Sequence, residues 1–207
     1  MVKNIKGGEN MTKQAAVMEL VKKNKGVITA KEISNENISP GIISYLVKKG
    51  SLVHSSRGIY TLPNVIEDEF LNLQVRFKRG IFSNETALFL WNLTDLTPNI
   101  YNMTFPTNYN LTNIYKIGVK PNQIKASLYE QGITTVNSPM GNNIKCYSKE
   151  RTLCDILRPK NAVDIQIVVD AFKRYVKEKE RNIPELSFFA KQLGVQEKVR
   201  SYLEVLL

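Results

Sequence analysis

Residues 39–63, SPGIISYLVKKGSLVHSSRGIYTLP, decide the fold of the N-terminal third of the chain. Ser39 and Pro40 predict the start of a helix, because serine satisfies free amides there and proline fits the first helical position. Gly50 predicts its end, since glycine adopts the left-handed conformation of a helix C-terminus without steric strain. The stretch therefore begins with one short helix.

Two alternating segments follow this helix, residues 52–55 and 59–62. Gly58 lies in the short connection between them, and glycine is typical of tight hairpin turns. The connection also contains Arg57, so the sequence predicts a β-hairpin with a cation at its tip. His54 falls in the first strand, where it could contact a phosphate or simply be exposed or packed.

The short helix has two different faces at 100° per residue. Ile43, Leu46 and Val47 form its apolar stripe. The opposite face is small, hydrogen-bonding and basic, with Gly41, Ser44, Tyr45 and Lys48, and with Lys49 beside them. A helix that enters the major groove of DNA presents such side chains outward.

Two further helices are expected upstream. Thr12 is a candidate N-cap for a helix that runs to about Asn24. Thr29 and Glu32 have the spacing of a capping box, which predicts a second helix that ends near Asn35. Three helices followed by a basic hairpin predict a winged helix-turn-helix.

The charge of the chain favours an anionic partner. The 207 residues include 29 Lys and Arg against 19 Asp and Glu, a net charge of +10. Residues 1–62 hold ten of the cations and four of the acids, so this third carries +6 of the total. DNA is the first candidate, although small helical domains of this kind also serve protein contacts. The candidate DNA-binding residues are Thr29, Lys31, Ser39, Gly41, Ser44, Tyr45, Lys48, Lys49, Ser56 and Arg57.

Pro63 and Asn64 predict a boundary between a winged-helix domain, residues 1–63, and a second domain, residues 64–207. Helices are expected near 65–78, 83–91, 123–130, 150–157, 163–177, 185–193 and 196–206, and extended runs at 100–105, 116–119, 132–136 and 145–147. The second domain therefore reads as α+β, a small antiparallel sheet packed with helices. Arg76, Lys78 and Arg79 end its first helix and are candidate additional DNA contacts, or serve another role.

Enzyme, metal and membrane signatures are missing from the sequence. Two cysteines and one histidine are too few for a zinc site or a disulfide framework. The chain has no Asp/Glu-x-Lys nuclease motif, no glycine-rich phosphate loop, no signal peptide and no apolar run of membrane-spanning length. Arg151 and Asp155 are four residues apart, which favours an intrahelical ion pair, with Cys154 packed behind it, over a catalytic site. We expect a cytoplasmic protein that is not an enzyme and needs no cofactor or metal.

Three segments in this order resemble the AbiEi family, the antitoxins of the bacterial abortive-infection E systems: residues 57–63, RGIYTLP; residues 86–91, TALFLW; and residues 147–157, YSKERTLCDIL. The resemblance implies a winged helix that represses its own operon by binding inverted repeats in promoter DNA. It also implies a C-terminal antitoxin domain that counteracts a cognate nucleotidyltransferase toxin in a type IV phage-resistance system, without a stable complex.

Two other classes remain open at this point. One is a winged-helix transcriptional regulator with a ligand-sensing C-terminal domain, and the other is an enzyme delivered to DNA, which the missing nuclease motif disfavours. The chain has no long heptad segment for a coiled-coil dimer. We therefore expect a monomer in solution that binds cooperatively on DNA, one molecule at each half-site.

Overall fold

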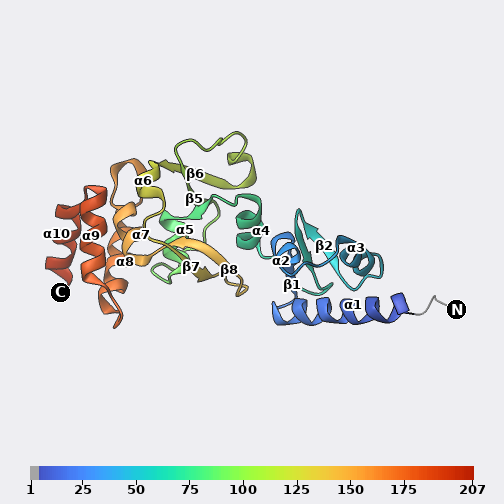
Figure 1. Ribbon diagram of the computed structural model, residues 1–207. Coiled ribbons are helices and arrows are strands. Elements are labelled where there is room, and N and C mark those ends of the chain that lie inside the picture. Colours follow the sequence, from blue (N-terminus) through green and yellow to red (C-terminus); the bar gives the residue numbers. More distant parts are fainter. Residues whose placement is uncertain (1–4) are drawn as a thin grey trace. The chain divides into compact units, whose positions relative to one another are not determined.

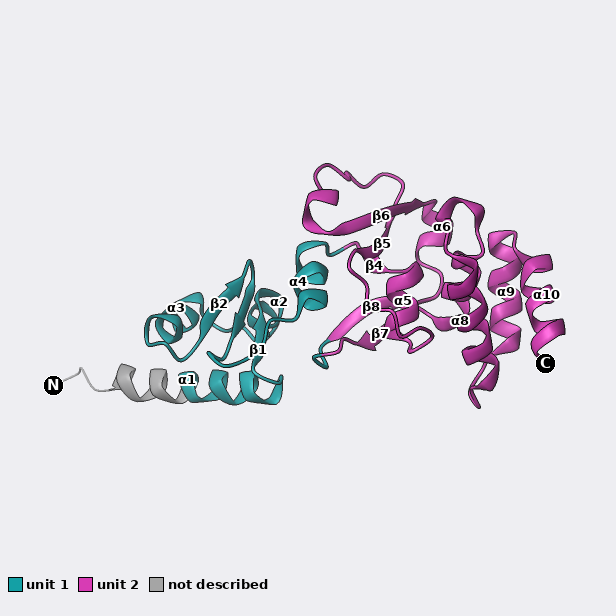
Figure 2. Cartoon of the chain, turned by 180° about the vertical axis from the view of Figure 1, so that it is seen from behind, with its two compact units in different colours: residues 1–78, 140–142 teal, residues 79–139, 143–207 magenta. Residues whose placement is uncertain are grey.

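The computed structural model describes the backbone of residues 5–207 and the side chains from residue 13 onward (Figure 1). The chain forms two compact units, coloured separately in Figure 2. Unit 1 comprises Met1–Lys78 with Met140–Asn142, and unit 2 comprises Arg79–Pro139 with Asn143–Leu207. Both units combine helices with a sheet, so the expected α+β class is confirmed.

Unit 1 contains four helices and three strands within its described residues. They are α1 (Ile5–Lys23), β1 (Val27–Thr29), α2 (Ala30–Asn35), α3 (Pro40–Lys48), β2 (Val53–Ser56), β3 (Ile59–Thr61) and α4 (Glu69–Arg76). The sheet order is β1-β3-β2, with both pairings antiparallel. Its core comes from α1, β1, α2, α3 and the segment before β2, and contains Val17, Val21, Ile28, Ile33, Ile43, Leu46 and Leu52.

Most local signals of this region are confirmed. The capping box is complete, because the Thr29 side chain accepts a hydrogen bond from the backbone of Glu32 and the Glu32 side chain accepts one from the backbone of Thr29. Helix α3 begins at Pro40, and Gly50 after it has a φ of 71°. The hairpin joins Ser56 to Ile59 directly across its turn.

Two expectations in this region were wrong, and one strand was not expected. Helix α1 begins at Ile5, so Thr12 lies inside it and does not start it. Strand β1 was not expected, because its three residues form a strand only by pairing with the distant β3. The expected helix at 65–78 begins only at Glu69, since Oδ1 of Asp68 accepts a hydrogen bond from the amide of Leu71 and caps the helix there.

The compact units divide between Lys78 and Arg79, later than the domain boundary expected at residues 63 and 64. The cause is the packing of helix α4. Leu71 of α4 is buried in a cluster with Val27 and Ile59, and Val75 packs against the same cluster. Residues of α4 therefore complete an apolar core on the outer side of the first sheet.

Unit 2 is built on a five-stranded sheet of order β6-β5-β4-β8-β7. Its elements are β4 (Ile81–Phe82), α5 (Asn84–Leu90), β5 (Tyr101–Pro106), η1 (Tyr115–Ile117), β6 (Val119–Ile124), α6 (Ala126–Tyr129), β7 (Ile133–Asn137), β8 (Asn143–Tyr147), α7 (Lys149–Ile156), η2 (Pro159–Asn161), α8 (Ile165–Lys177), α9 (Ile183–Leu193) and α10 (Gln196–Leu206). Strand β4 is an addition to the expected elements, and its two residues are too few for a periodic signal.

The sheet is mixed, so the expectation of an antiparallel sheet was wrong. Strands β5 and β6 are parallel, as are β4 and β8, while β4 pairs with β5 and β7 with β8 antiparallel. A parallel neighbour needs a crossover of about a dozen residues. Residues 107–118 supply one between β5 and β6, and the run expected at 116–119 turned out to belong mostly to this crossover.

Helices α5 and α7 to α10 share one apolar core, in which Phe172, Leu186 and Tyr175 are buried. Helix α7 packs against α5 and α9 (Figure 1). Helix α8 packs against α10. No helix among residues 5–207 is both long and apolar enough to cross a membrane.

Candidate nucleic-acid interface

Helix α3 divides its side chains as its sequence pattern predicts. Ile43 and Leu46 are buried in the core of unit 1, and Val47 packs against that core. The candidate DNA-binding positions of this helix are all exposed: Gly41, Ser44, Tyr45, Lys48 and the C-capping Lys49. One side of α3 is therefore fixed by the core, and its other side presents two cations, a serine and a tyrosine to solvent.

Tyr45 is the large side chain on this exposed face. Its exposed fraction is 40%, and Nζ of Lys49 lies 5.1 Å from the centre of its ring. A cation at this distance is attracted to the ring face. The tyrosine hydroxyl and the lysine ammonium thus form a joint polar surface near the end of α3.

The approach to α3 is also polar. Ser39 is the N-cap residue and is exposed, and its side chain makes no capping hydrogen bond. Lys31 is exposed in the first turn of α2. Ser39 thus has an uncommitted hydroxyl beside the free amides at the start of α3.

Two candidate residues have hydroxyls that are bonded inside the fold. The Thr29 hydroxyl donates to Oε2 of Glu32 at 2.8 Å and belongs to the capping box. The Ser56 hydroxyl donates to Oδ1 of Asn72 at 2.9 Å. Both side chains therefore stabilise local structure, which sequence spacing indicated for Thr29 but not for Ser56.

The hairpin tip is anchored on two sides. Besides the Ser56 bond, the Ser55 hydroxyl donates to Oε1 of Glu67 at 2.9 Å. The carbonyl of Gly58 accepts a hydrogen bond from the amide of Ala30 at 2.7 Å. Gly58 has a φ of 79°, the left-handed conformation that glycine adopts without strain. These contacts hold the turn and leave the side chain of Arg57 exposed at its end.

Glu67 and Asn72 are contributors to this region that sequence reasoning missed. The one available signal was Asn72 itself, a polar residue between Leu71 and Leu73, both buried, in α4. Its partner cannot be read from spacing, because the hydrogen bond joins residues sixteen positions apart.

The three cations at the end of the expected helix 65–78 do not share one environment. Arg76 and Lys78 are exposed in unit 1, and the guanidinium carbon of Arg76 lies 5.7 Å from the ring centre of Phe77. Arg79 belongs to unit 2, where its Nη2 donates to Oδ1 of Asn108 at 3.4 Å. Only Arg76 and Lys78 are thus part of the unit that contains α3.

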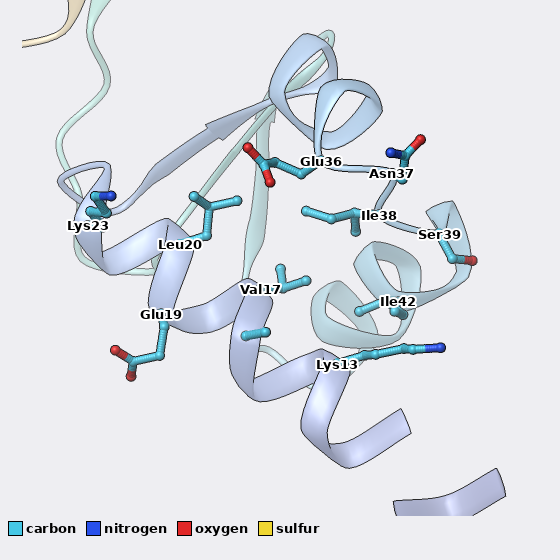
Figure 3. Close-up of a pocket in the computed structure, with 11 residues that line it drawn as sticks. Lys13, Val17, Glu19, Leu20, Lys23, Glu36, Asn37, Ile38, Ser39 and Ile42 are labelled. Atoms are coloured by element: carbon cyan, nitrogen blue, oxygen red, sulfur yellow. The ribbon is translucent and has the colours of Figure 1, made fainter. Parts of the chain in front are cut away.

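A groove of about 670 Å³ lies between α1 and the turn that joins α2 to α3 (Figure 3). Val17, Leu20, Ile38 and Ile42 give it an apolar lining. Ser39 lies at its margin, but none of the exposed residues Gly41, Ser44, Tyr45, Lys48 and Lys49 lines it. The groove is therefore a separate feature from the polar face of α3.

In unit 2, the polar cluster of helix α7 is buried. Arg151 has no exposed surface, and its Nε donates to Oδ2 of Asp155 at 2.8 Å, as the spacing predicted. Its Nη1 donates to the carbonyls of Leu128 and Gln131 at 2.9 and 3.0 Å. The guanidinium thereby ties helix α7 to α6 and to the turn between α6 and β7, which is a structural role.

Cys154 is buried behind this ion pair, as expected. Burial raises the pKa of its thiol above the ordinary value, and the nearby Asp155 carboxylate acts in the same direction. A thiol with a raised pKa is a poor nucleophile at neutral pH.

The geometry defines unit 1 as a helix-turn-helix region, with α2 and α3 as its two helices and a polar, cationic face on the second. The comparisons with known proteins agree. Residues 16–63 match a family described as "Transcriptional regulator, AbiEi antitoxin", which confirms the resemblance over that segment. The match extends from α1 through the hairpin and supports an antitoxin or regulator role.

The fold of the whole chain is similar to the crystal structure of the RV2827C protein from Mycobacterium tuberculosis. The TM-score is 0.51 at 15% sequence identity, and the similarity covers 93% of this chain and 81% of that chain. At this identity the likeness shows the fold alone. No curated protein matches the sequence.

Proposed function

We propose that the protein is an autorepressing antitoxin that binds inverted repeats in the promoter of its own operon and counteracts a nucleotidyltransferase toxin. The observation that carries the DNA-binding part is the polar, cationic face of α3, held outward by the buried Ile43 and Leu46. The family match of residues 16–63 supports both the regulator and the antitoxin role.

In this proposal unit 1 acts as a winged helix-turn-helix. Helix α3 enters the major groove, where Ser44, Tyr45 and Lys48 meet base edges and phosphates. The β2–β3 hairpin is the wing, and Arg57 at its tip contacts a flanking phosphate. The sheet order β1-β3-β2 supports this assignment. Strand β3 of the hairpin pairs with β1, and β1 leads directly into helix α2.

The two activities occupy different parts of the chain. We assign DNA binding to residues 1–63 and the antitoxin activity to residues 64–207, with Arg76 and Lys78 as candidate further phosphate contacts. The packing of α4 against Val27 and Ile59 means that residues 64–78 also support the DNA-binding part. The antitoxin acts in the cytoplasm, and two monomers bind the DNA cooperatively. The system is of type IV, in which the antitoxin counteracts the toxin without forming a stable complex with it.

The proposal is tested by expressing the full-length chain together with the gene downstream of its own and with a promoter reporter. We expect rescue of growth from the neighbouring toxin and repression of the reporter. A Lys48→Ala, Arg57→Ala double variant should keep the rescue and lose the repression. Absence of rescue by the wild-type chain, with the neighbouring gene shown to be toxic, would overturn the antitoxin assignment.

One observation favours the alternative of a ligand-sensing regulator. Unit 2 has a cavity of about 450 Å³ between η2, the start of α8 and α10, lined by apolar side chains and by Arg158 and Lys198. This volume is within the range of small-molecule sites. A metabolic operon downstream, with no toxin gene, would favour this alternative.

A further inference from the structure

The strand region of unit 2 is almost free of negative charge. Between Asp95 and Glu130 the sequence has no Asp or Glu, but it has three lysines, six asparagines and four tyrosines. All three lysines, Lys116, Lys120 and Lys125, are exposed. This composition is typical of a surface that meets a polyanion through cations and neutral hydrogen-bonding groups.

Two of these lysines, Lys120 and Lys125, lie at the outer edge of the sheet. Strand β6 is the first strand of the order β6-β5-β4-β8-β7, and within the described part of the chain its one neighbour is β5 (Figure 1). Lys120 lies near the start of β6, and Lys125 comes directly after its end at Ile124. Five residue steps of about 3.3 Å separate the two lysines by about 17 Å along the strand.

A third lysine joins them from η2. Nζ of Lys160 donates to Oδ1 of Asn122 at 3.1 Å and to the carbonyl of Gln123 at 3.0 Å, so it lies over the middle of β6. The pKa of Lys160 lies below its ordinary value because its ammonium is partly desolvated and because Arg158 is near. Asp155 acts in the opposite direction, but its carboxylate is already bonded to Arg151 and Arg158.

A stacked aromatic pair with a nearby guanidinium lies where the parallel strands β5 and β6 end. The rings of Phe105 and Tyr109 are stacked with centres 4.6 Å apart, and the guanidinium carbon of Arg79 lies 5.9 Å from the Tyr109 ring centre. Gln123 joins this stack to the strand, because its Nε2 donates to the carbonyl of Tyr109 at 2.9 Å. Phe105 is fully buried, whereas Arg79 is exposed, so the Arg79 side chain is an accessible cation beside the stacked rings.

Arg79 is fixed in this position by its neighbours. Its Nη2 donates to Oδ1 of Asn108 at 3.4 Å, and its own carbonyl accepts a hydrogen bond from the Tyr129 hydroxyl at 2.5 Å. Glu130, the acid next to Tyr129 in the sequence, is exposed and is the carboxylate that ends the acid-free stretch. A guanidinium plane backed by an aromatic ring offers a flat cationic surface for an unpaired base.

We propose that Arg79, Tyr109, Lys120, Lys125 and Lys160, the β6-edge patch, bind single-stranded nucleic acid. The lysines contact successive phosphates along β6, and one base stacks on the Arg79 guanidinium. A duplex fits the patch less well, because its bases are already stacked on one another. The site is independent of the DNA-reading role of α3, since all five residues belong to unit 2.

The test uses the full-length chain with Lys48→Ala and Arg57→Ala, so that the candidate contacts of unit 1 are weakened. Fluorescence anisotropy measures binding of labelled 12-nucleotide oligo-U, oligo-dT and a 12-base-pair duplex at about 50 mM salt. We expect tighter binding of a single strand than of the duplex. A preference for oligo-U identifies RNA as the ligand, and a preference for oligo-dT identifies DNA.

A triple Lys120→Gln, Lys125→Gln, Lys160→Gln variant of that protein should bind the single strand at least about tenfold more weakly. The magnitude of its slope of log K against log salt should fall by about 0.7 for each lost phosphate contact. Arg79→Ala should weaken binding by about tenfold while keeping most of the slope, because it removes a stacked base.

The matched control replaces three exposed lysines of α8 and α9, Lys173, Lys177 and Lys191, with glutamine. It should bind like its parent. Equal affinities of the patch triple and this control would overturn the proposal, and so would tighter binding of the duplex. Placed in the wild-type background, the patch triple should retain operator binding, which separates this proposal from the function of unit 1.

Discussion

The Ser56 hydroxyl of the hairpin and Oδ1 of Asn72 in α4 are 2.9 Å apart and form a hydrogen bond. A helix outside the three-helix pattern therefore holds the segment that we propose as a wing. The bond is partly buried and is reinforced by the apolar contacts of Leu71 and Val75 with the same sheet.

An Asn72→Ala substitution tests this anchoring. It removes one partner of a partly buried hydrogen bond, which costs about 1 kcal/mol of unfolding free energy. Operator affinity should also fall, because the hairpin loses its fixed position, but the salt slope should not change since no phosphate contact is removed. Denaturant unfolding and gel shifts measure both effects, with the exposed Asn64→Ala as control. An Asn72→Ala protein with unaltered stability and affinity would contradict this role.

Local sequence signals predicted those helix ends and turns that are determined by residues only a few positions apart. The capping box at Thr29 and Glu32, the Ser39-Pro40 start of α3 and the glycine turn of the hairpin are of this kind. The hydrogen bond of the Ser56 hydroxyl could not be predicted, because its partner Asn72 lies in another element.

Strand pairing was the least predictable feature. Strands β1 and β4 have three and two residues, and each exists because a distant strand lies beside it. The parallel pairing of β5 with β6 depends on the path of the connecting residues 107–118. The sequence pattern does not predict that path. The β6-edge patch was equally hidden, since Arg79 meets Tyr109, and Lys160 meets β6, only in the folded chain.

Arg151→Met should strongly destabilise the protein. The substitution leaves the buried Asp155 carboxylate without its closest cation and two carbonyls without a donor, and breaking such a pair costs about 3–5 kcal/mol. Chemical denaturation followed by circular dichroism measures the loss. A second substitution, Asp155→Leu, should recover part of it. Arg200→Ala, which breaks the exposed ion pair with Glu204, is the control and should have no measurable effect. Similar midpoints for Arg151→Met and the control would refute this assignment.

The two thiols should be inert in the folded protein. Burial raises the pKa of both Cys146 and Cys154, so the reactive thiolate is less populated than in an exposed cysteine at any given pH. With Ellman's reagent at pH 8 we expect no rapid reaction in buffer and two reactive thiols in guanidinium chloride. Stoichiometric labelling of either cysteine in the native protein would contradict this prediction, because it would show that the region around that cysteine opens to solvent.

Tyr45→Ala should reduce sequence preference more than electrostatic attraction. If the ring and hydroxyl meet base edges, the affinity ratio between operator and scrambled duplex should fall by about tenfold, with an unchanged salt slope. Tyr115→Ala, an exposed tyrosine of unit 2, is the matched control. A uniform loss of affinity on both duplexes would instead place Tyr45 at the phosphate backbone.

The central claim is that α3 and the hairpin tip bind the promoter of the protein's own operon. The most direct measurement is the affinity of the full-length chain for that promoter fragment across a range of salt concentrations. We predict that Lys48→Ala and Arg57→Ala each weaken binding and each reduce the magnitude of the slope of log K against log salt by about 0.9. Lys22→Ala, an exposed cation of α1 paired with Glu19, should leave the slope as in the wild type. Wild-type affinity and slope in both the Lys48→Ala and the Arg57→Ala proteins would contradict the account.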